Sequence, residues 1–104
     1  MKKKLDFTDW ETEYEIVIEN RLAKELAQML KRGRSEKKFT DIILKLARGE
    51  KLPFQNRDHA LSGEWIGYRD CHIEPDRILI YRIDGDKLIL VLTRTGTHAD
   101  LFGK

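Results

Sequence analysis

The chain has 104 residues, which is the size of one small domain. Hydrophobic residues make up 40% and charged residues 37%, a balance too apolar for a disordered tail and too charged for a membrane protein. The longest uncharged apolar run, Leu88–Leu92, is far shorter than the roughly 20 residues of a membrane-spanning helix. The single cysteine, Cys71, cannot form an internal disulfide or a cysteine-based zinc cluster, so we expect a cytoplasmic protein.

The net charge is only +2, but the charges are unevenly distributed. Residues 5–20 contain six acidic and no basic side chains, whereas residues 31–51 contain eight basic and three acidic ones. An excess of positive charge over one pair of helices can attract a polyanion such as RNA. The alternative is a solvated helical surface with ordinary ion pairs, and charge alone favours that alternative.

The first half of the chain predicts one strand and two helices. Residues 1–13 have no clear periodicity and form an acidic extension, after which Tyr14–Glu19 is a β-prone run ending at Asn20, a candidate helix N-cap. Apolar residues then recur at helical spacing, and Gly33 and Gly49 provide the two helix ends. These residues are Leu22, Leu26, Met29 and Leu30 in the first helix, and Phe39, Ile42, Ile43 and Leu46 in the second, which Ser35 can cap. A helical hairpin is therefore expected.

The second half predicts three strands, over Trp65–Ile73, Ile78–Ile83 and Leu88–Thr95. Glu74-Pro75-Asp76 is typical of a turn, and Asp84-Gly85-Asp86 indicates a hairpin with a type I′ connection. The last two strands are apolar on both faces, which favours central positions covered by the helices. The expected fold is α+β in the order β-α-α-β-β-β, with a helical hairpin packed on a small, mainly antiparallel sheet.

The residues with chemical potential lie in the second half. Three histidines, together with nearby aspartates and arginines, match the needs of metal-free RNA cleavage, because an imidazole with a pKa of about 6.5 can accept or donate a proton near neutral pH. A carboxylate can orient an imidazole or act as a base, and an arginine can stabilise charge on phosphoryl oxygens. A metal site is a weaker hypothesis, since no His-x-His or His-Glu-x-x-His spacing occurs.

Three segments together carry a family resemblance: Asp58–Gly63, Gly67–Asp76 and Arg94–Phe102. Their motifs, Asp-His-x-Leu-x-Gly, Gly-x-Arg-Asp-x-His-x-x-Pro-Asp and Arg-Thr-Gly-Thr-His-x-x-Leu-Phe, closely resemble the YafQ branch of the RelE/ParE toxin superfamily. The resemblance implies a RelE-like domain over residues 14–104. It also implies a toxin of a type II toxin–antitoxin system that cuts messenger RNA in the ribosomal A site without a metal or a cofactor.

Carried over by position, the resemblance implies catalytic roles for six residues: His59, His72, Asp76, Arg94, His98 and Phe102. In this resemblance His98 and Asp76 are most central to proton transfer, Arg94 binds the phosphate, and Phe102 holds a base or orders the site. Attack by the 2′-hydroxyl would give a 2′,3′-cyclic phosphate or 3′-phosphate and a 5′-hydroxyl. Expected RNA contacts are Arg77, which replaces the usual aromatic residue, and Lys31, Arg32, Lys37, Lys38, Lys45, Arg48 and Lys51.

The expected partners are the ribosome, messenger RNA and a cognate antitoxin of the DinJ/RelB kind, with no membrane involved. Two alternatives are kept at this point. One is a ParE-like toxin that inhibits a protein target without cutting RNA, and the other is a catalytically decayed toxin that binds only its antitoxin.

Overall fold

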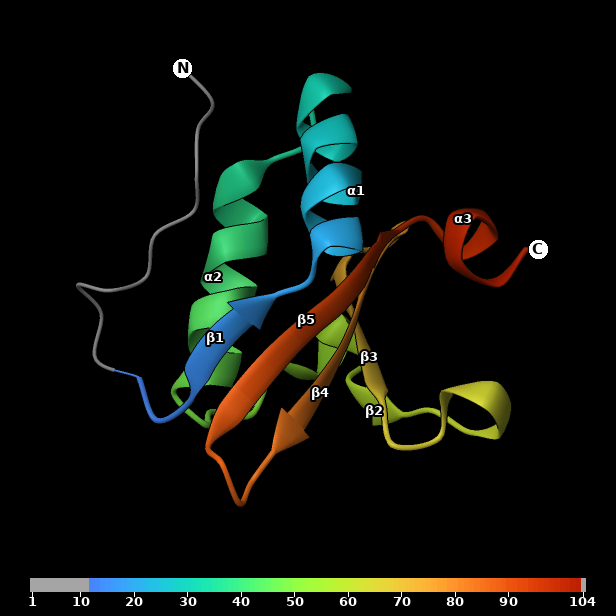
Figure 1. The fold of residues 1–104 in the computed structure, drawn as a ribbon. Coiled ribbons are helices and arrows are strands. Elements are labelled where there is room, and N and C mark those ends of the chain that lie inside the picture. Colours follow the sequence, from blue (N-terminus) through green and yellow to red (C-terminus); the bar gives the residue numbers. More distant parts are fainter. Residues whose placement is uncertain (1–11, 104) are drawn as a thin grey trace.

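The computed structural model describes residues 12–103, which form a five-stranded sheet with two long helices on one side (Figure 1). The elements in chain order are β1 (Glu15–Ile18), α1 (Asn20–Lys31), α2 (Glu36–Ala47), β2 (His59–Ala60), β3 (Arg69–Glu74), β4 (Arg77–Asp84), β5 (Ile89–Gly96) and α3 (His98–Phe102). The sheet order is β1-β5-β4-β3-β2; β1 is parallel to β5 and all other pairs are antiparallel. The predicted α+β class and mainly antiparallel sheet are confirmed.

The helical hairpin follows the local signals in its sequence. Gly33 and Gly49, which follow the two helices, have φ values of +85° and +76°, and this left-handed conformation is easiest for glycine. Ser35 caps α2, because its hydroxyl accepts a hydrogen bond of 3.1 Å from the Lys38 backbone N–H. The expected Asn20 cap is wrong: Asn20 is the first residue of α1, and the capping position is Glu19, whose side chain makes no cap bond.

The main core lies between α1, α2 and one face of the sheet. It buries the predicted apolar stripes of both helices against Cys71, Leu79, Tyr81, Leu90 and Leu92. The opposite face of the sheet has its own small core, in which Ile78, Ile80 and Leu101 are buried. The prediction that the β4 and β5 segments are central strands is therefore confirmed, but the helical hairpin covers only one of their faces.

The second face is covered by α3 and by the segment around β2, which lie across the sheet from α1 and α2 in Figure 1. Neither α3 nor β2 was predicted. The predicted strand over Trp65–Ile73 is too long, because Gly63–Trp65 is a turn of 3₁₀ helix and β3 begins only at Arg69. In this segment Trp65 and Tyr68 pack edge to face, with ring centroids 5.3 Å apart, so their aromatic side chains serve the second core rather than a strand.

The two hairpin turns differ in how well the sequence predicts them. Pro75 and Asp76 form the predicted two-residue turn between β3 and β4. The β4–β5 connection is longer than the expected type I′ turn: four residues separate the strands, and the positive φ is at Leu88 (+55°), not at Gly85. The Asp84 carboxylate accepts hydrogen bonds from the next backbone N–H groups along the loop, which favours this wider turn.

The acidic extension predicted for residues 1–13 lies mostly outside the described residues, of which it includes only Thr12 and Glu13. The backbone N–H groups of Glu13 and Tyr14 both donate to the carbonyl of Ala47, at 2.8 and 2.9 Å, and so attach the start of the described chain to the end of α2. Within the described part of the chain, each helix is too short or too polar to cross a lipid bilayer.

Candidate active site

The three expected catalytic histidines lie toward one end and on one face of the sheet. Along β3, Cys71 and Ile73 face the main core, so Asp70 and His72 face the opposite side. We call this side, which also carries Ile78 and Ile80, the histidine face. The strand register places His72 opposite Ile78, which in turn pairs with Gly96. Because neighbouring strands lie about 4.8 Å apart, the backbone of Gly96, two residues before α3, is about 10 Å from that of His72.

His59 and Asp70 form the second row of this face. The two residues are register partners in the short β2–β3 ladder, and His59 Nδ1 lies 3.2 Å from Asp70 Oδ1. Asp70 is 4% exposed, and Oδ1 has no well-aligned hydrogen bond within the described residues. Burial raises the pKa of the Asp70 carboxyl, while the charges of His59, His72 and His98 oppose that rise. Asp70 is thus a buried carboxyl in contact with His59, on the face of β3 that also carries His72.

Asp70 lies beside these histidines, and the sequence analysis assigned it no role. It appears there only as the first Asp of the Gly-x-Arg-Asp-x-His-x-x-Pro-Asp motif. The signal was the alternation of β3, because a strand that buries Cys71 and Ile73 on one side must place Asp70 beside His72 on the other.

Two of the imidazoles have one nitrogen fixed by an acceptor. His59 Nδ1 lies 2.8 Å from the Arg57 carbonyl, and His72 Nδ1 lies 3.2 Å from the Pro75 carbonyl. Since a carbonyl can only accept, both Nδ1 atoms carry the proton, and in the neutral ring Nε2 then keeps a lone pair. Each ring can thus accept a proton at Nε2, and return it once protonated.

The third imidazole, His98, begins α3. Thr97 and Asp100 form a capping box, in which the Thr97 hydroxyl accepts from the Asp100 N–H and the Asp100 carboxylate accepts from the Thr97 N–H. This double cap holds a helix of only five residues at the end of β5. The rings of His98 and Phe102 pack together with centroids 4.9 Å apart, and Phe102 also packs against the second core. His98 and Phe102, two of the expected site residues, are therefore in contact.

Arg94, the expected phosphate-binding residue, is engaged by a carboxylate from α1. Its guanidinium donates to both Glu25 oxygens at 2.7–3.1 Å, and the same carboxylate accepts from the Thr95 N–H at 3.1 Å. The contact forms where β5 extends beyond β1, whose pairing ends at Leu92. A pocket beside it is lined by Glu25, Gln28, Met29, Arg32, Arg94, Thr95, Gly96 and Asp100. Of the expected catalytic residues, this pocket reaches Arg94 alone.

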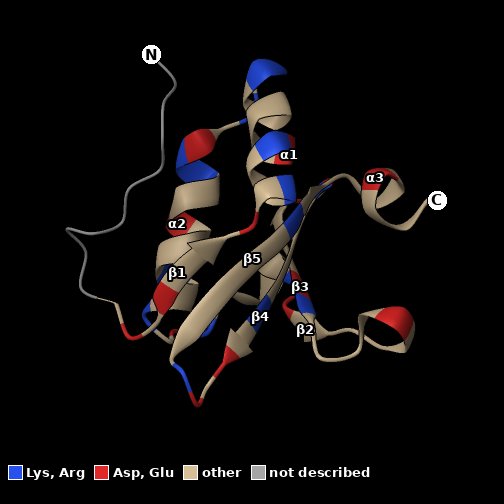
Figure 2. Cartoon of the chain, in the orientation of Figure 1, with Lys and Arg blue, Asp and Glu red and all other residues tan. Residues whose placement is uncertain are grey.

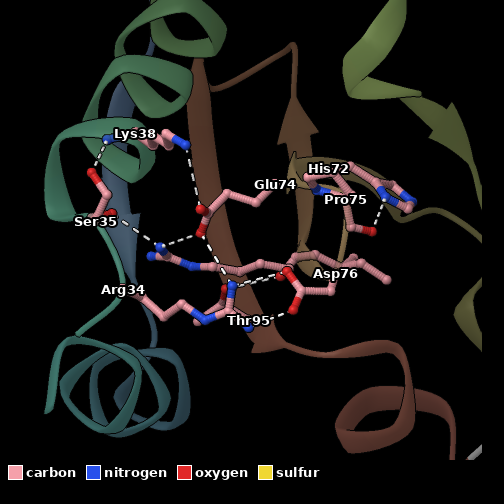
Figure 3. Close-up of polar contacts among 10 residues, drawn as sticks. Arg34, Ser35, Lys38, His72, Glu74, Pro75, Asp76 and Thr95 are labelled. Carbon is pink, nitrogen blue, oxygen red and sulfur yellow. Dashed lines mark hydrogen bonds and ion pairs between the residues drawn. The ribbon is translucent and has the colours of Figure 1, made fainter. Parts of the chain in front are cut away.

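Asp76 lies in the β3–β4 turn and is bound by an arginine that follows α1. Arg34 donates to its two oxygens at 2.9 and 2.5 Å (Figure 3). This hydrogen-bonded pairing lowers the pKa of the Asp76 carboxyl, so Asp76 is ionised at neutral pH and cannot be the proton donor there.

Asp58 and Arg69, which belong to the motifs that carry the family resemblance, are paired with each other. Arg69 Nε lies 3.3 Å from Asp58 Oδ1, and the Tyr81 hydroxyl donates to the same oxygen at 2.6 Å. The pair therefore connects the segment before β2 to the buried side of β4. Within residues 12–103, no three histidine, cysteine or acidic side chains are grouped as metal ligands.

The expectation that Arg77 contacts RNA is wrong for this structure, because its side chain is fully buried. The guanidinium lies over the Phe39 ring, 5.5 Å from its centroid, and donates to the Ser35 carbonyl at 3.0 Å. Arg77 instead ties the start of β4 to the break between the long helices. Its position on the helix side of β4, next to the stripe residue Phe39, is what makes it inaccessible.

Most of the other expected RNA-binding residues are exposed on the helical hairpin, where the ribbon in Figure 2 is coloured for basic residues at the end of α1. Lys31, Arg32, Lys37, Lys38, Arg48 and Lys51 are exposed, and Lys45 is half-buried. Acidic side chains lie beside some of them: Lys37 is 2.9 Å from Asp41, and Lys38 is 3.5 Å from Glu74. The positive surface is therefore partly neutralised by acidic neighbours.

Comparison with known proteins points to one family. Residues 14–103 match the family described as "Bacterial toxin of type II toxin-antitoxin system, YafQ". The chain is 62% identical over 52 residues to the mRNA interferase toxin YafQ of Escherichia coli K12, an alignment covering 50% of this chain and 54% of that protein. The chain is thus aligned with about half the length of this curated relative.

Two solved structures are similar over a longer stretch. YafQ from E. coli BL21(DE3) has a TM-score of 0.81 at 36% identity, covering 86% of this chain and 99% of that one. The E. coli DinJ-YafQ toxin-antitoxin complex contains a chain with a TM-score of 0.80 at 38% identity, covering 88% and 99%. Since the family match spans nearly all the described residues, the chain belongs to the YafQ family of bacterial type II toxin–antitoxin toxins.

Proposed function

We propose that the protein is an endoribonuclease toxin that cuts messenger RNA in the ribosomal A site, acts in the cytoplasm and needs no metal. Family membership and the similarity to E. coli mRNA interferase toxins support this proposal. The observation that carries it is that His72, the His59–Asp70 contact and α3 with His98 all lie on the histidine face of the sheet. A toxin that only blocks a protein target does not need such an acid–base group.

The proposed reaction is a transfer within the RNA. A base removes the proton of a ribose 2′-hydroxyl, the 2′-oxygen bonds to the adjacent phosphorus, and the bond from phosphorus to the 5′-oxygen breaks. An acid gives a proton to that 5′-oxygen, so the products are a 2′,3′-cyclic phosphate and a 5′-hydroxyl end. Each imidazole can serve as base or acid near neutral pH, whereas ionised Asp76 can accept a proton or orient a neighbour. Coupled groups in one site need not divide these roles cleanly.

The other expected site residues have supporting roles in this proposal. Arg94, oriented by Glu25, would place positive charge beside the reacting phosphate from the end of β5. Phe102 would hold His98 through its ring and offer a surface for a base. The exposed lysines and arginines of the helical hairpin would contact ribosomal RNA, and this contact should weaken as salt rises.

We also propose a cognate antitoxin as partner. The support is the family, together with the solved E. coli complex of YafQ with DinJ. A partly disordered acidic segment that folds on the toxin would cover either the basic helices or the histidine face, and both would stop activity.

The test is inducible expression in a bacterium, with primer extension on a translated message. The wild-type chain is expected to arrest growth and to produce new 5′ ends within codons only when ribosomes translate the message. His98→Gln and His72→Gln should each reduce cleavage by about 100-fold or more, since general acid–base catalysis contributes about 10²–10⁴-fold. The matched control is Lys87→Gln, in the β4–β5 loop at the far end of the sheet, which should cut like the wild type. Equal arrest and cleavage by the histidine variants would overturn the proposal.

A further inference from the structure

The contact between Arg34 and Asp76 joins two parts of the chain that are 42 residues apart. Arg34 is in the short break between α1 and α2, and Asp76 is in the β3–β4 turn (Figure 3). The two terminal guanidinium nitrogens, Nη1 and Nη2, each donate to one carboxylate oxygen, which is the geometry that fixes a carboxylate most firmly. We call this two-point contact the fork. Asp76 has 61% of its side chain exposed, so without this fork its carboxylate would rotate freely in solvent.

A second carboxylate, Glu74, organises the surroundings of this fork. Its Oε1 lies 3.6 Å from Arg34 and 3.4 Å from Arg77, and its Oε2 lies 3.5 Å from Lys38. Three cations from the helix break, α2 and β4 therefore meet at one acidic side chain. The buried Arg77 also donates a hydrogen bond to the carbonyl of Ser35, the residue after Arg34. This bond fixes the backbone next to Arg34.

The fork lies next to one of the imidazoles. His72 Nδ1 is 3.2 Å from the carbonyl of Pro75, the residue that precedes Asp76, so the His72 ring and the Asp76 carboxylate are attached to the same two-residue turn (Figure 3). A change in the orientation of this turn would move both groups. Arg34 contacts this turn from the helix side, because it reaches Asp76 across the end of the sheet.

We propose that Arg34 is a positioning residue of the nuclease site, which holds the Asp76 carboxylate and the adjoining turn in the geometry that cleavage requires. This inference rests on the proposed function. Asp76 is then a fixed, ionised acceptor, and the direction of its pKa shift, downward and chiefly through the Arg34 hydrogen bonds, is consistent with that. Arg34 acts through Asp76 and does not itself need to touch the RNA.

The test uses purified full-length chain, programmed ribosomes and single-turnover cleavage, with Arg34→Gln and Arg34→Lys compared with the wild type. Arg34→Gln should lower the cleavage rate at saturating toxin by about 10–100-fold and leave the half-saturating concentration within about twofold, since misplacement of a reacting group by 1 Å can cost about 100-fold. Arg34→Lys keeps the charge but loses the fork, so its cleavage rate should lie between those of the wild type and Arg34→Gln. Lys87→Gln, which removes one positive charge in the β4–β5 loop, is the control and should cut like the wild type.

The decisive comparison is made in an Asp76→Asn background. If Arg34 acts through Asp76, adding Arg34→Gln to Asp76→Asn should lower the rate no further, because the effects of residues that act as a unit do not add. Additive losses, or a raised half-saturating concentration with an unchanged rate, would show that Arg34 binds RNA directly and would overturn the inference. If folded Arg34→Gln cuts like the wild type, only the inference about Arg34 is overturned. If the wild-type chain itself does not cut, the proposed function is overturned as well.

Discussion

Removal of the Glu25 carboxylate is expected to destabilise the protein strongly, although Glu25 is not in the apolar core. Its carboxylate accepts three hydrogen bonds from Arg94 and one from the Thr95 N–H. The Glu25 side chain is 19% exposed and the Arg94 side chain 12%. Loss of one partner of a buried pair costs about 3–5 kcal/mol, because the other charge stays buried and unpaired. Residual contact with solvent favours the lower end, about 3 kcal/mol for Glu25→Ala.

For a domain of this size, 1 kcal/mol corresponds to about 4–8 °C, so thermal unfolding followed by circular dichroism should show a Tm about 12–24 °C lower. The control is Asp41→Ala, which breaks the exposed Lys37–Asp41 pair and should lower the Tm by less than about 4 °C. The double variant Glu25→Ala/Arg94→Ala should lose much less stability than the sum of the losses in the two single variants. A Glu25→Ala chain that melts within about 4 °C of the wild type would refute this reasoning.

Three further predictions concern buried polar groups. Cys71 is fully buried and burial raises the pKa of its thiol, so a thiol reagent should modify it only as fast as the chain unfolds; rapid labelling of the native protein would contradict this. Tyr81→Phe removes a 2.6 Å hydrogen bond to Asp58 and should lower the free energy of unfolding in urea by about 2 kcal/mol, whereas an unchanged value would mean that the bond contributes nothing. The raised pKa of Asp70 means that the folded state keeps a proton that the unfolded chain loses, so the contribution of Asp70 to stability should fall as the pH rises from about 4. Asp70→Asn should therefore be more stable than the wild type at about pH 7 but not at about pH 4, and the reverse order in urea unfolding would refute that sign.

The parts of the fold that could be predicted are those with short-range signals. Gly33, Ser35 and Pro75 each act on the backbone within a few residues, and each occurs where its chemistry predicts a helix end, a cap or a turn. The missed elements are short: α3 has five residues and β2 has two, so neither shows a helical or alternating period. The capping box of Thr97 was the available signal for α3, and it was not recognised.

In the candidate site too, the local signals were predictable and the long-range contacts were not. The motifs and their resemblance to a family indicated the six expected catalytic residues, but not the state in which the structure holds them. Arg94 is paired with Glu25 across 69 residues of sequence, and Asp76 with Arg34 across 42. No local pattern encodes a contact of that range. The burial of Arg77 was missed for a related reason, since a cation at the start of a strand is normally expected to be exposed.

The most direct test of the account is the chemistry of the cut itself. A message is prepared with a methoxy group in place of the 2′-hydroxyl at the nucleotide 5′ to the mapped cleavage site, and is presented to the wild-type chain on ribosomes. If the histidines move the proton of that hydroxyl, the modified message should stay intact, while the unmodified one gives a 5′-hydroxyl end that polynucleotide kinase can label directly. Cleavage of the methoxy message at the same position, or products that carry a 5′-phosphate, would contradict the account.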